Sequence, residues 1–173
     1  FYVLSPGGGW RSKCWPPERF GILCRELAER HGWHAVVHCG PGEEAVGKAV
    51  VSAAAPARPL LMTPDLSGMM ALLQRARFVV AGDTGPLHLA AALGTPVVGV
   101  YGPTDPERNG PYGQVNSVVR NAPREETTYR RGDDYSPAML SITVEQVCAA
   151  IERRLAAGSP SGTAPGAVRG ARL

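Results

Sequence analysis

The sequence predicts an α/β domain built on one parallel sheet with helices on both faces. Short apolar runs of strand length alternate with longer segments whose apolar residues recur at helical spacing, from residue 2 to about residue 155. A length of 173 residues suits one domain, and 44% hydrophobic with 19% charged residues is typical of a globular chain. We therefore expect a doubly wound parallel sheet over residues 1–156.

The first half of the chain contains three expected strands and three expected helices. The strands are 2–4, 35–39 and 60–62, and the helices run from Pro16 or Pro17 to 30, from 43 to 55, and from an N-cap at Asp65 or Ser67 to 75. Gly32 ends the first helix, and Gly40-Pro41-Gly42 is a turn before the second. Strands and helices thus alternate as in βαβ units.

The second half continues the pattern with strands at 78–81, 97–100 and 115–119 and helices at 87–93 and 144–155, the last with Thr143 as its expected N-cap. Residues 121–140 are polar and lack periodicity. Residues 157–173 are rich in Gly, Ser, Pro and Ala, which predicts a disordered tail.

Bulk properties exclude several classes of protein. The apolar stretch 87–100 is interrupted by Gly94 and Pro96, so no transmembrane helix is expected. The net charge of +3 is dispersed, which argues against a nucleic-acid partner and leaves room for peripheral association with an anionic membrane surface. Four cysteines without a Cys-x-x-Cys pair predict no disulfide framework, no zinc site and a reduced, cytoplasmic chain. The start at Phe1 has no signal-peptide features and suggests a fragment of a longer protein.

The most informative segment is 78–113, where an expected strand leads into Gly82-Asp83-Thr84-Gly85-Pro86 and a helix. The first turn of a helix has backbone N–H groups without intrahelical partners, and Pro86 is tolerated there because it has no N–H. Gly82 and Gly85 leave room for a ligand to approach the backbone. These features predict a phosphate-binding site.

Further polar groups follow the other expected strands. Ligands of open parallel sheets bind beyond the carboxyl ends of the strands, so these groups should meet in one cleft. The candidate binding residues are Ser5, Gly8, Gly9, Lys13, Glu43, Glu44, Asp83, Thr84, Gly85, Pro86, His88, Thr104 and Asp105. In contrast, His34 and His38 are expected to be structural, and Met69 and Met70 are expected in the core.

Two known phosphate motifs fit the first loop poorly. The spacing Gly7-x-Gly9-x-x-Ser12 lacks the third glycine of the dinucleotide fingerprint, and no acidic residue ends the second strand. Lys13 is preceded by Ser12 and followed by Cys14, which does not match a P-loop. Neither NAD nor a P-loop nucleotide is therefore the favoured ligand, and no cofactor is expected.

Segment 78–113 closely resembles the nucleotide-sugar-binding half of the heptosyltransferase-type glycosyltransferases, which move heptose from ADP-heptose onto the lipopolysaccharide inner core. The first loop is similar as well, because Pro6 and Gly7 are followed by Lys13 and then by Trp15-Pro16. The resemblance covers residues 2–155 and implies the Rossmann-like C-terminal domain of a GT-B fold.

The resemblance also implies roles for the first loops of the site. Lys13 would contact the donor pyrophosphate, and Glu43, with Glu44 as second choice, would accept hydrogen bonds from the ribose hydroxyls. Some relatives carry hydroxyl residues where this chain has Gly8 and Gly9. Backbone N–H groups would have to replace those hydroxyls.

The remaining roles fall on the segment after the fourth strand. The donor phosphates would lie on the helix start at Thr84, whose hydroxyl can donate a hydrogen bond. An anionic Asp83 would repel phosphate, so it braces the turn or meets a sugar hydroxyl or cation, and His88 binds phosphate or packs inward. The sugar side would be lined by Thr104 and Asp105, with Arg108 and Asn109.

The resemblance implies half of an inverting transferase that binds an ADP-sugar donor. The general base and the glycolipid acceptor site would belong to an absent N-terminal domain, so no catalytic residue and no metal site are assigned here, and this chain alone should transfer little or no sugar. The enzyme would work in the cytoplasm, at the inner face of the bacterial inner membrane. Two alternatives stay open: another GT-B half, such as that of a sugar-nucleotide epimerase, and a non-catalytic nucleotide-sugar-binding module.

Overall fold

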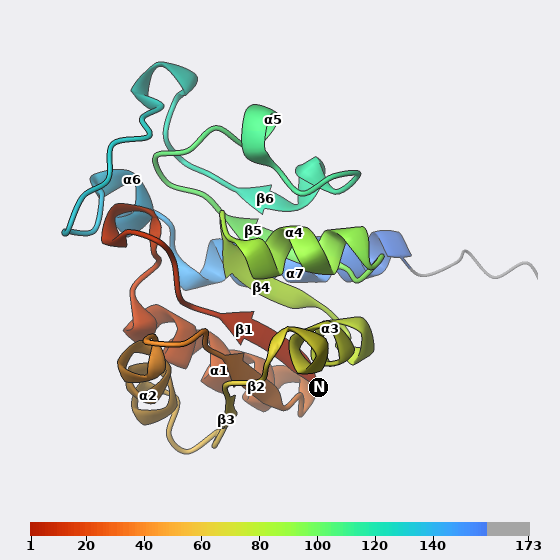
Figure 1. Ribbon diagram of the computed structural model, residues 1–173. Coiled ribbons are helices and arrows are strands. Elements are labelled where there is room, and N and C mark those ends of the chain that lie inside the picture. The colour runs from red at the N-terminus through yellow and green to blue at the C-terminus, as the bar shows by residue number, and fades with distance from the viewer. Residues whose placement is uncertain (159–173) are drawn as a thin grey trace, which may run out of the picture.

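The computed structural model describes residues 1–158, which form a six-stranded sheet between two layers of helices (Figure 1). The strand order is β3-β2-β1-β4-β5-β6, and every neighbouring pair is parallel. This order confirms the predicted doubly wound α/β class. The strands are β1 (Tyr2–Ser5), β2 (Ala35–His38), β3 (Leu60–Met62), β4 (Val79–Gly82), β5 (Val97–Val100) and β6 (Val118–Val119).

The helices are α1 (Pro17–His31), α2 (Glu44–Ala53), α3 (Leu66–Arg75), α4 (Gly85–Ala92), α5 (Pro106–Asn109), α6 (Pro137–Leu140) and α7 (Val144–Gly158), with 3-10 turns η1 (Arg11–Lys13), η2 (Val115–Ser117) and η3 (Arg124–Glu126). Helices α1 to α4 and α7 lie where the apolar periodicity predicts them, with boundaries that differ by a few residues, and the short helices α5 and α6 were not predicted. Within residues 1–158, no helix is both long and apolar enough to cross a membrane.

Three helix boundaries have clear local causes. Gly32 ends α1 with a φ of +66°, in the left-handed region that glycine adopts without strain. Asp65 is the N-cap of α3 and accepts a hydrogen bond of 2.7 Å from the Gly68 N–H. Thr143 and Gln146 form a reciprocal capping box before α7, since each side chain accepts from the other residue's backbone N–H.

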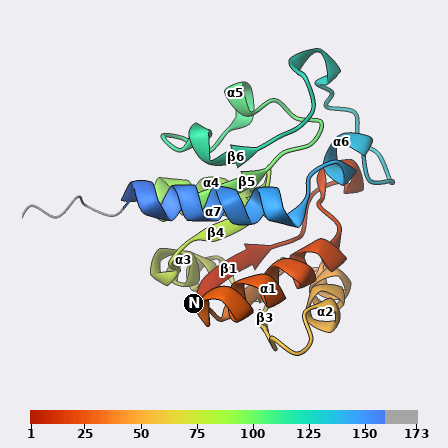
Figure 2. The same cartoon turned by 180° about the vertical axis from the view of Figure 1, so that it is seen from behind.

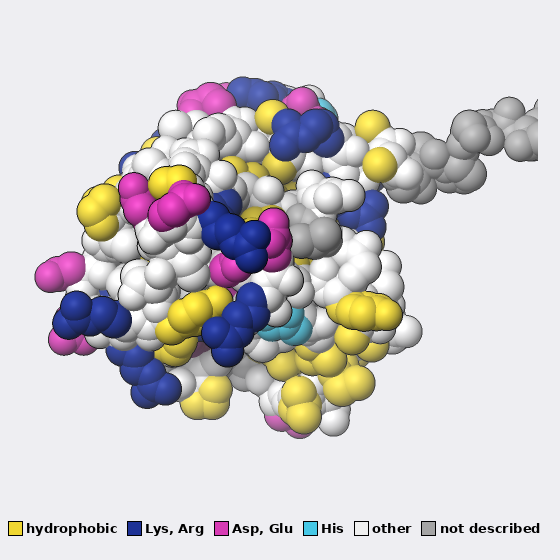
Figure 3. Space-filling model, turned by 90° about the horizontal axis from the view of Figure 1, so that it is seen from above, with side chains coloured by type: hydrophobic (Ala, Val, Ile, Leu, Met, Phe, Trp, Pro, Cys, Tyr) yellow, Lys and Arg dark blue, Asp and Glu magenta, His cyan; other side chains and the backbone are white. Residues whose placement is uncertain are grey.

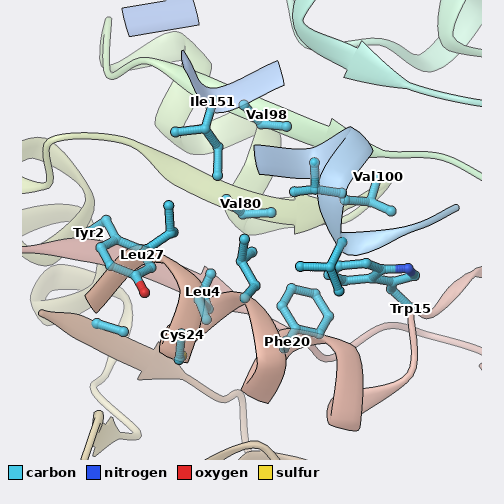
Figure 4. Packing of buried hydrophobic residues seen from close by; sticks show 14 of the residues in the cluster. Tyr2, Leu4, Trp15, Phe20, Cys24, Leu27, Val80, Val98, Val100 and Ile151 are labelled. Atoms are coloured by element: carbon cyan, nitrogen blue, oxygen red, sulfur yellow. The ribbon is translucent and has the colours of Figure 1, made fainter. Parts of the chain in front are cut away.

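The two faces of the sheet bury different helices because alternate strand residues point to opposite sides. One core cluster joins Tyr2, Leu4, Val80, Val98 and Val100 to the apolar faces of α1 and α7 (Figure 4). Figure 2 shows these two helices across the rear of the sheet. On the other face, a second cluster joins Val3, Val79 and Val97 to Leu73 of α3 and Leu87 of α4.

The structure departs from the sequence prediction in three places. Residues 115–117 form a 3-10 turn rather than strand, because both the amide and the hydroxyl of Ser117 bond to the Gln114 carbonyl and close the chain locally. The polar segment 121–140 contains η3 and α6. Met70 is 39% exposed instead of lying in the core, because it projects from the outer side of α3.

The C-terminal prediction is only partly covered by the structure. Helix α7 continues to Gly158, three residues beyond the predicted end at Leu155. Most of the predicted disordered tail, residues 159–173, lies outside the described residues.

Candidate functional site

A cavity of about 550 Å³ opens at the carboxyl ends of β1, β2 and β3 and at the start of α4. It lies beside the boundary between β1 and β4, where the chain leaves one half of the sheet and begins the other. Ligands of doubly wound sheets bind at such a switch point. The sequence-predicted residues that line the cavity are Ser5, Gly8, Gly9, Lys13, Glu43, Thr84, Gly85 and Pro86.

The start of α4 presents its first turn to this cavity. Thr84 is the N-cap, with extended backbone, and its hydroxyl donates to the Gly82 carbonyl at 3.3 Å. Gly85 is exposed, and a Cβ added there would meet nothing within 4 Å. A Cβ at Gly82, in contrast, would lie 3.3 Å from the Lys13 carbonyl. Gly85 thus leaves room for a ligand, whereas Gly82 leaves room for the β1–α1 loop and not, as the sequence suggested, for a ligand.

Lys13 joins the two loops that frame one end of the cavity. Its Nζ donates a hydrogen bond of 2.6 Å to the Asp83 carbonyl and lies 4.0 Å from the centroid of the Trp10 ring. The Arg131 guanidinium also lies over this ring, at 5.3 Å. An ammonium group has three donors, so Lys13 can keep the Asp83 contact and still bind an anion. The sequence does not predict the contact between the Trp10 ring and Lys13, because this contact depends on the conformation of the loop.

The β1–α1 loop is held in place by a segment that is distant in sequence. Ser12 donates its backbone N–H to Gly132 and its hydroxyl to the Arg130 carbonyl. On the other side of the loop, the Trp15 indole N–H donates to the Ile142 carbonyl at 3.0 Å. These contacts fix η1, and with it Lys13, against the body of the domain.

Asp83 is buried and turned toward two polar side chains. Its Oδ1 lies 3.1 Å from His88 Nε2, and its Oδ2 accepts from Asn109 Nδ2 at 3.4 Å. Burial by itself would raise the pKa of Asp83, but the His88 hydrogen bond, the charge of Lys13 and the Asn109 hydrogen bond together hold it below its ordinary value. The carboxylate therefore stays ionised and braces the β4–α4 turn, which fits the first of the two roles expected for it. Neither Asp83 nor His88 lines the cavity.

Of the two glutamates after β2, only Glu43 lines the cavity. Its Oε2 accepts a hydrogen bond of 2.9 Å from the Gly40 N–H, which closes the 40–43 turn. Gly7 permits this arrangement, because a Cβ at residue 7 would lie 2.0 Å from the Glu43 Oε2. Glu44 instead accepts from the Gly42 N–H on the exposed side of α2, where hydrogen bonds from backbone N–H groups lower its pKa.

The residues expected on the sugar side, Thr104, Asp105, Arg108 and Asn109, follow β5. Thr104 is buried, and Asp105 is the N-cap of α5 and accepts from the Glu107 N–H at 2.9 Å. Neither lines the cavity. Asn109 donates to Asp83, whose pKa a hydrogen bond from Thr104 also lowers, and Arg108 lies over the Tyr129 ring.

Several residues that line the cavity were not among the predicted binding residues, and most of them lie at or after the ends of β2 and β3. They are His38, Pro41, Pro64, Asp65, Leu66 and Met69, together with Gly7 and Gly40. The rule that ligands bind at the carboxyl ends of strands could have identified His38 and Pro64. The apolar residues around His38 and Met69 instead led to the prediction that His38 is structural and that Met69 lies in the core. Met69 does pack against the second core cluster, and it also borders the cavity.

Charge on the face seen from above in Figure 1 is mixed. Lys and Arg side chains are interspersed there with Asp and Glu (Figure 3). Arg124 and Glu107 form an ion pair, 3.0 Å apart. Within residues 1–158, no group of three or more His, Cys, Asp or Glu side chains is arranged to hold a metal ion. All four cysteines are free.

The fold and the cavity together define a doubly wound α/β domain with a cavity at the switch point of its parallel sheet, the position at which ligands of such sheets bind. Residues 1–138 match the model of glycosyltransferase family 9 (heptosyltransferase). The chain belongs to this family.

Curated proteins with similar sequences are heptosyltransferases. The chain is 35% identical over 114 residues to lipopolysaccharide heptosyltransferase 1 of Pseudomonas aeruginosa, a match that covers 66% of this chain and 32% of the relative. It is 40% identical over 113 residues to lipopolysaccharide heptosyltransferase 1 of Escherichia coli K12, covering 65% and 35%. The matched region is thus about a third of the length of these relatives.

Solved structures agree with the observed fold. E. coli ADP-heptose lipopolysaccharide heptosyltransferase II superimposes with a TM-score of 0.79 at 22% identity, over 90% of this chain and 46% of that one. The E. coli heptosyltransferase WaaC with ADP superimposes with a TM-score of 0.68 at 30% identity, over 88% and 44%. These neighbours confirm the predicted fold class, that of the GT-B heptosyltransferases.

Proposed function

We propose that this chain is the donor-binding half of an inverting glycosyltransferase that transfers heptose from ADP-heptose to a lipopolysaccharide core or related glycan. The observation that carries the proposal is the position of Lys13, whose Nζ lies between the Trp10 ring and the start of α4 at the edge of the cavity. A family relative, at 32% identity, has been solved with ADP-2-deoxy-2-fluoro heptose.

The cavity can accommodate a nucleoside diphosphate laid across the strand ends. Its volume of about 550 Å³ is in the range of small-ligand sites. The diphosphate would meet Lys13 and the first turn of α4, and the ribose would lie near Glu43. The base would rest on the apolar surface of Pro64, Leu66 and Met69, which follows β3.

The chemical contribution of this half would be to the leaving group. As the bond between the sugar and the diphosphate breaks, negative charge develops on the departing ADP. The ammonium of Lys13 and the N-terminal end of the α4 dipole stabilise that charge. Asp83 keeps its own negative charge turned toward His88 and Asn109 and away from the phosphates.

The acceptor site and the general base would lie outside these 173 residues. This part of the proposal is supported by the share of the relatives that the chain spans, 32% and 35% for the two heptosyltransferases 1. The chain by itself should bind donor and leave acceptor unglycosylated. We further propose that it acts in the cytoplasm, peripherally at the inner membrane, where lipopolysaccharide precursors are anchored.

Calorimetric titration of the chain with ADP, ADP-heptose, UDP and NAD tests the proposal. ADP and ADP-heptose should bind, UDP should bind more weakly because a pyrimidine covers less of the apolar surface, and NAD should bind least. Equal binding of all four compounds, or tighter binding of NAD, would contradict the donor assignment. Absence of any nucleotide binding would contradict it as well.

A further inference from the structure

His38 lies at the floor of the cavity and has no role in the proposed function so far. It is the last residue of β2, is 4% exposed, and lines the cavity. Its Nδ1 lies 3.2 Å from the hydroxyl of Ser5, the last residue of β1, which is 2% exposed. The parallel pairing of β1 with β2 places both side chains at the same edge of the sheet.

Only one side of the imidazole is occupied by protein. Within residues 1–158, Nε2 has no hydrogen-bond partner, and the side chain borders the cavity. Nε2 is not enclosed by protein atoms and is open to the cavity. A ligand in the cavity can therefore hydrogen-bond Nε2 directly.

The neighbours of His38 indicate which part of a nucleotide would lie above it. Glu43 is close enough for its charge to raise the pKa of His38, although burial, the larger effect, lowers that pKa overall. Lys13 and Thr84 border the phosphate end of the cavity, and Leu66 and Met69 border its apolar end. His38 and Glu43 lie between these ends, where the ribose joins base and diphosphate.

We infer that His38 is a specificity-determining residue that hydrogen-bonds a ribose hydroxyl of the donor nucleotide through Nε2, with Ser5 as the positioning residue of the imidazole. The inference rests on the proposed function, because it requires a nucleotide in the cavity. When the Ser5 hydroxyl donates to Nδ1, the ring proton is on Nε2. Nε2 then donates to a ribose oxygen, while the Glu43 carboxylate accepts a ribose hydroxyl proton. One donor and one acceptor thus match the two functions of a hydroxyl group.

Binding of ADP, 2′-deoxy-ADP and 3′-deoxy-ADP to His38 variants tests the inference. His38→Phe keeps an aromatic ring and removes Nε2, and His38→Gln restores an N–H donor at the end of the side chain. The wild-type chain should prefer ADP over one of the deoxy analogues by about 3- to 10-fold, the value of one neutral hydrogen bond. His38→Phe should lower this ratio with unchanged affinity for that deoxy analogue, the remaining preference being the contribution of Glu43, and His38→Gln should restore part of the loss.

The control is His34→Phe, an exposed histidine just before β2, at the opposite edge of the sheet. It should keep the wild-type ratio. Ser5→Ala should lower the ratio less than His38→Phe, because the ring remains but is held less firmly. A wild-type ratio retained in His38→Phe would overturn the inference.

A measurement on the wild-type chain avoids dependence on the folding of variants. In ¹⁵N-histidine NMR spectra, the Nε2 resonance of His38 should move on addition of ADP and stay in place with 2′,3′-dideoxy-ADP. The same small response to both nucleotides would overturn the inference while leaving the proposed function intact. A wild-type chain that binds no nucleotide would instead contradict the proposed function.

Discussion

The two ends of the cavity are built in different ways. The phosphate end is made by two loops, with a lysine and the first turn of α4, and much of it lies in one continuous stretch at residues 84–86. The nucleoside end is assembled from side chains that follow β2 and β3, among them His38, Glu43 and Met69. The first end relies on backbone geometry and the second on side-chain identity.

This difference predicts how substitutions should act. Anion binding by a helix start and a lysine should respond strongly to loss of charge and little to the nucleoside attached to the phosphates. The nucleoside end should contribute less affinity per residue and more selectivity. Each of the following changes affects one end, and its effect on the ligand series shows whether the two ends are separable.

Lys13→Met should weaken ADP binding about 10- to 100-fold, because charge-assisted hydrogen bonds contribute about 1.5 to 3 kcal/mol. Calorimetry with ADP and adenosine measures this, and adenosine binding should change little. Lys48→Met, which removes an exposed lysine on α2, is the matched control and should bind ADP like the wild type. An equal loss for adenosine would show that Lys13 supports the whole cavity rather than the phosphate end.

Gly7→Ala should weaken ADP binding several-fold, because the new Cβ would displace the Glu43 carboxylate from its position over Gly40. The clash is with the end of a flexible side chain, so the melting temperature should fall little. Gly9→Ala is the matched comparison, since a Cβ there meets nothing within 4 Å, and it should weaken binding less. Equal losses for the two variants would argue against a role for Glu43 at the nucleoside end.

Leu66→Ser should weaken ADP binding about two- to three-fold and reduce the preference for ADP over UDP, because part of the apolar surface beneath the base is lost. Leu66 is 64% exposed, so unfolding by urea should be unchanged. Leu60→Ser is the control: Leu60 is 59% exposed but lies outside the cavity. Competition between ADP and UDP measures the preference, and an unchanged preference would place the base elsewhere.

As the pH falls, the free energy of unfolding should decrease first through protonation of His38, at the nucleoside end, and only at lower pH through protonation of Asp83, beside the phosphate end. The pKa of His38 is lowered below 6.5 by burial, so the unfolded chain binds this proton first and stability falls as the pH drops below about 6.5. The pKa of Asp83 lies below 3.8, so the contribution of its ionised form is lost only below that pH, as the pH falls through the lowered pKa. Urea unfolding at pH 7.5 and 5.5 should show a loss that cannot exceed about 1.4 kcal/mol per pH unit for one proton.

His38→Gln should flatten this dependence between pH 7.5 and 5.5, whereas His34→Gln should preserve it, because His34 is exposed. The same dependence in both variants would assign the acid sensitivity to a group other than His38.

The sequence by itself determined the order of strands and helices, because periodicities of 2 and 3.6 and glycine or proline at the boundaries are local properties. It also located Lys13 and the start of α4, since a glycine-flanked turn before a helix is readable in one stretch of chain. It misjudged residues 115–117, where the hydrogen bonds of Ser117 to the Gln114 carbonyl favoured a local turn over pairing in a strand, while 118–119 form the predicted strand.

The tertiary structure alone decided which polar groups meet. Parallel pairing brought the ends of β1 and β2 together and placed Ser5 beside His38, a contact between residues 33 apart in sequence. It also turned Asp83 away from the cavity toward His88 and Asn109, and left Thr104 and Asp105 outside the cavity lining. The physical reason is that sequence spacing specifies local conformation, whereas side-chain direction depends on long-range packing and on hydrogen bonds that only the folded chain can form.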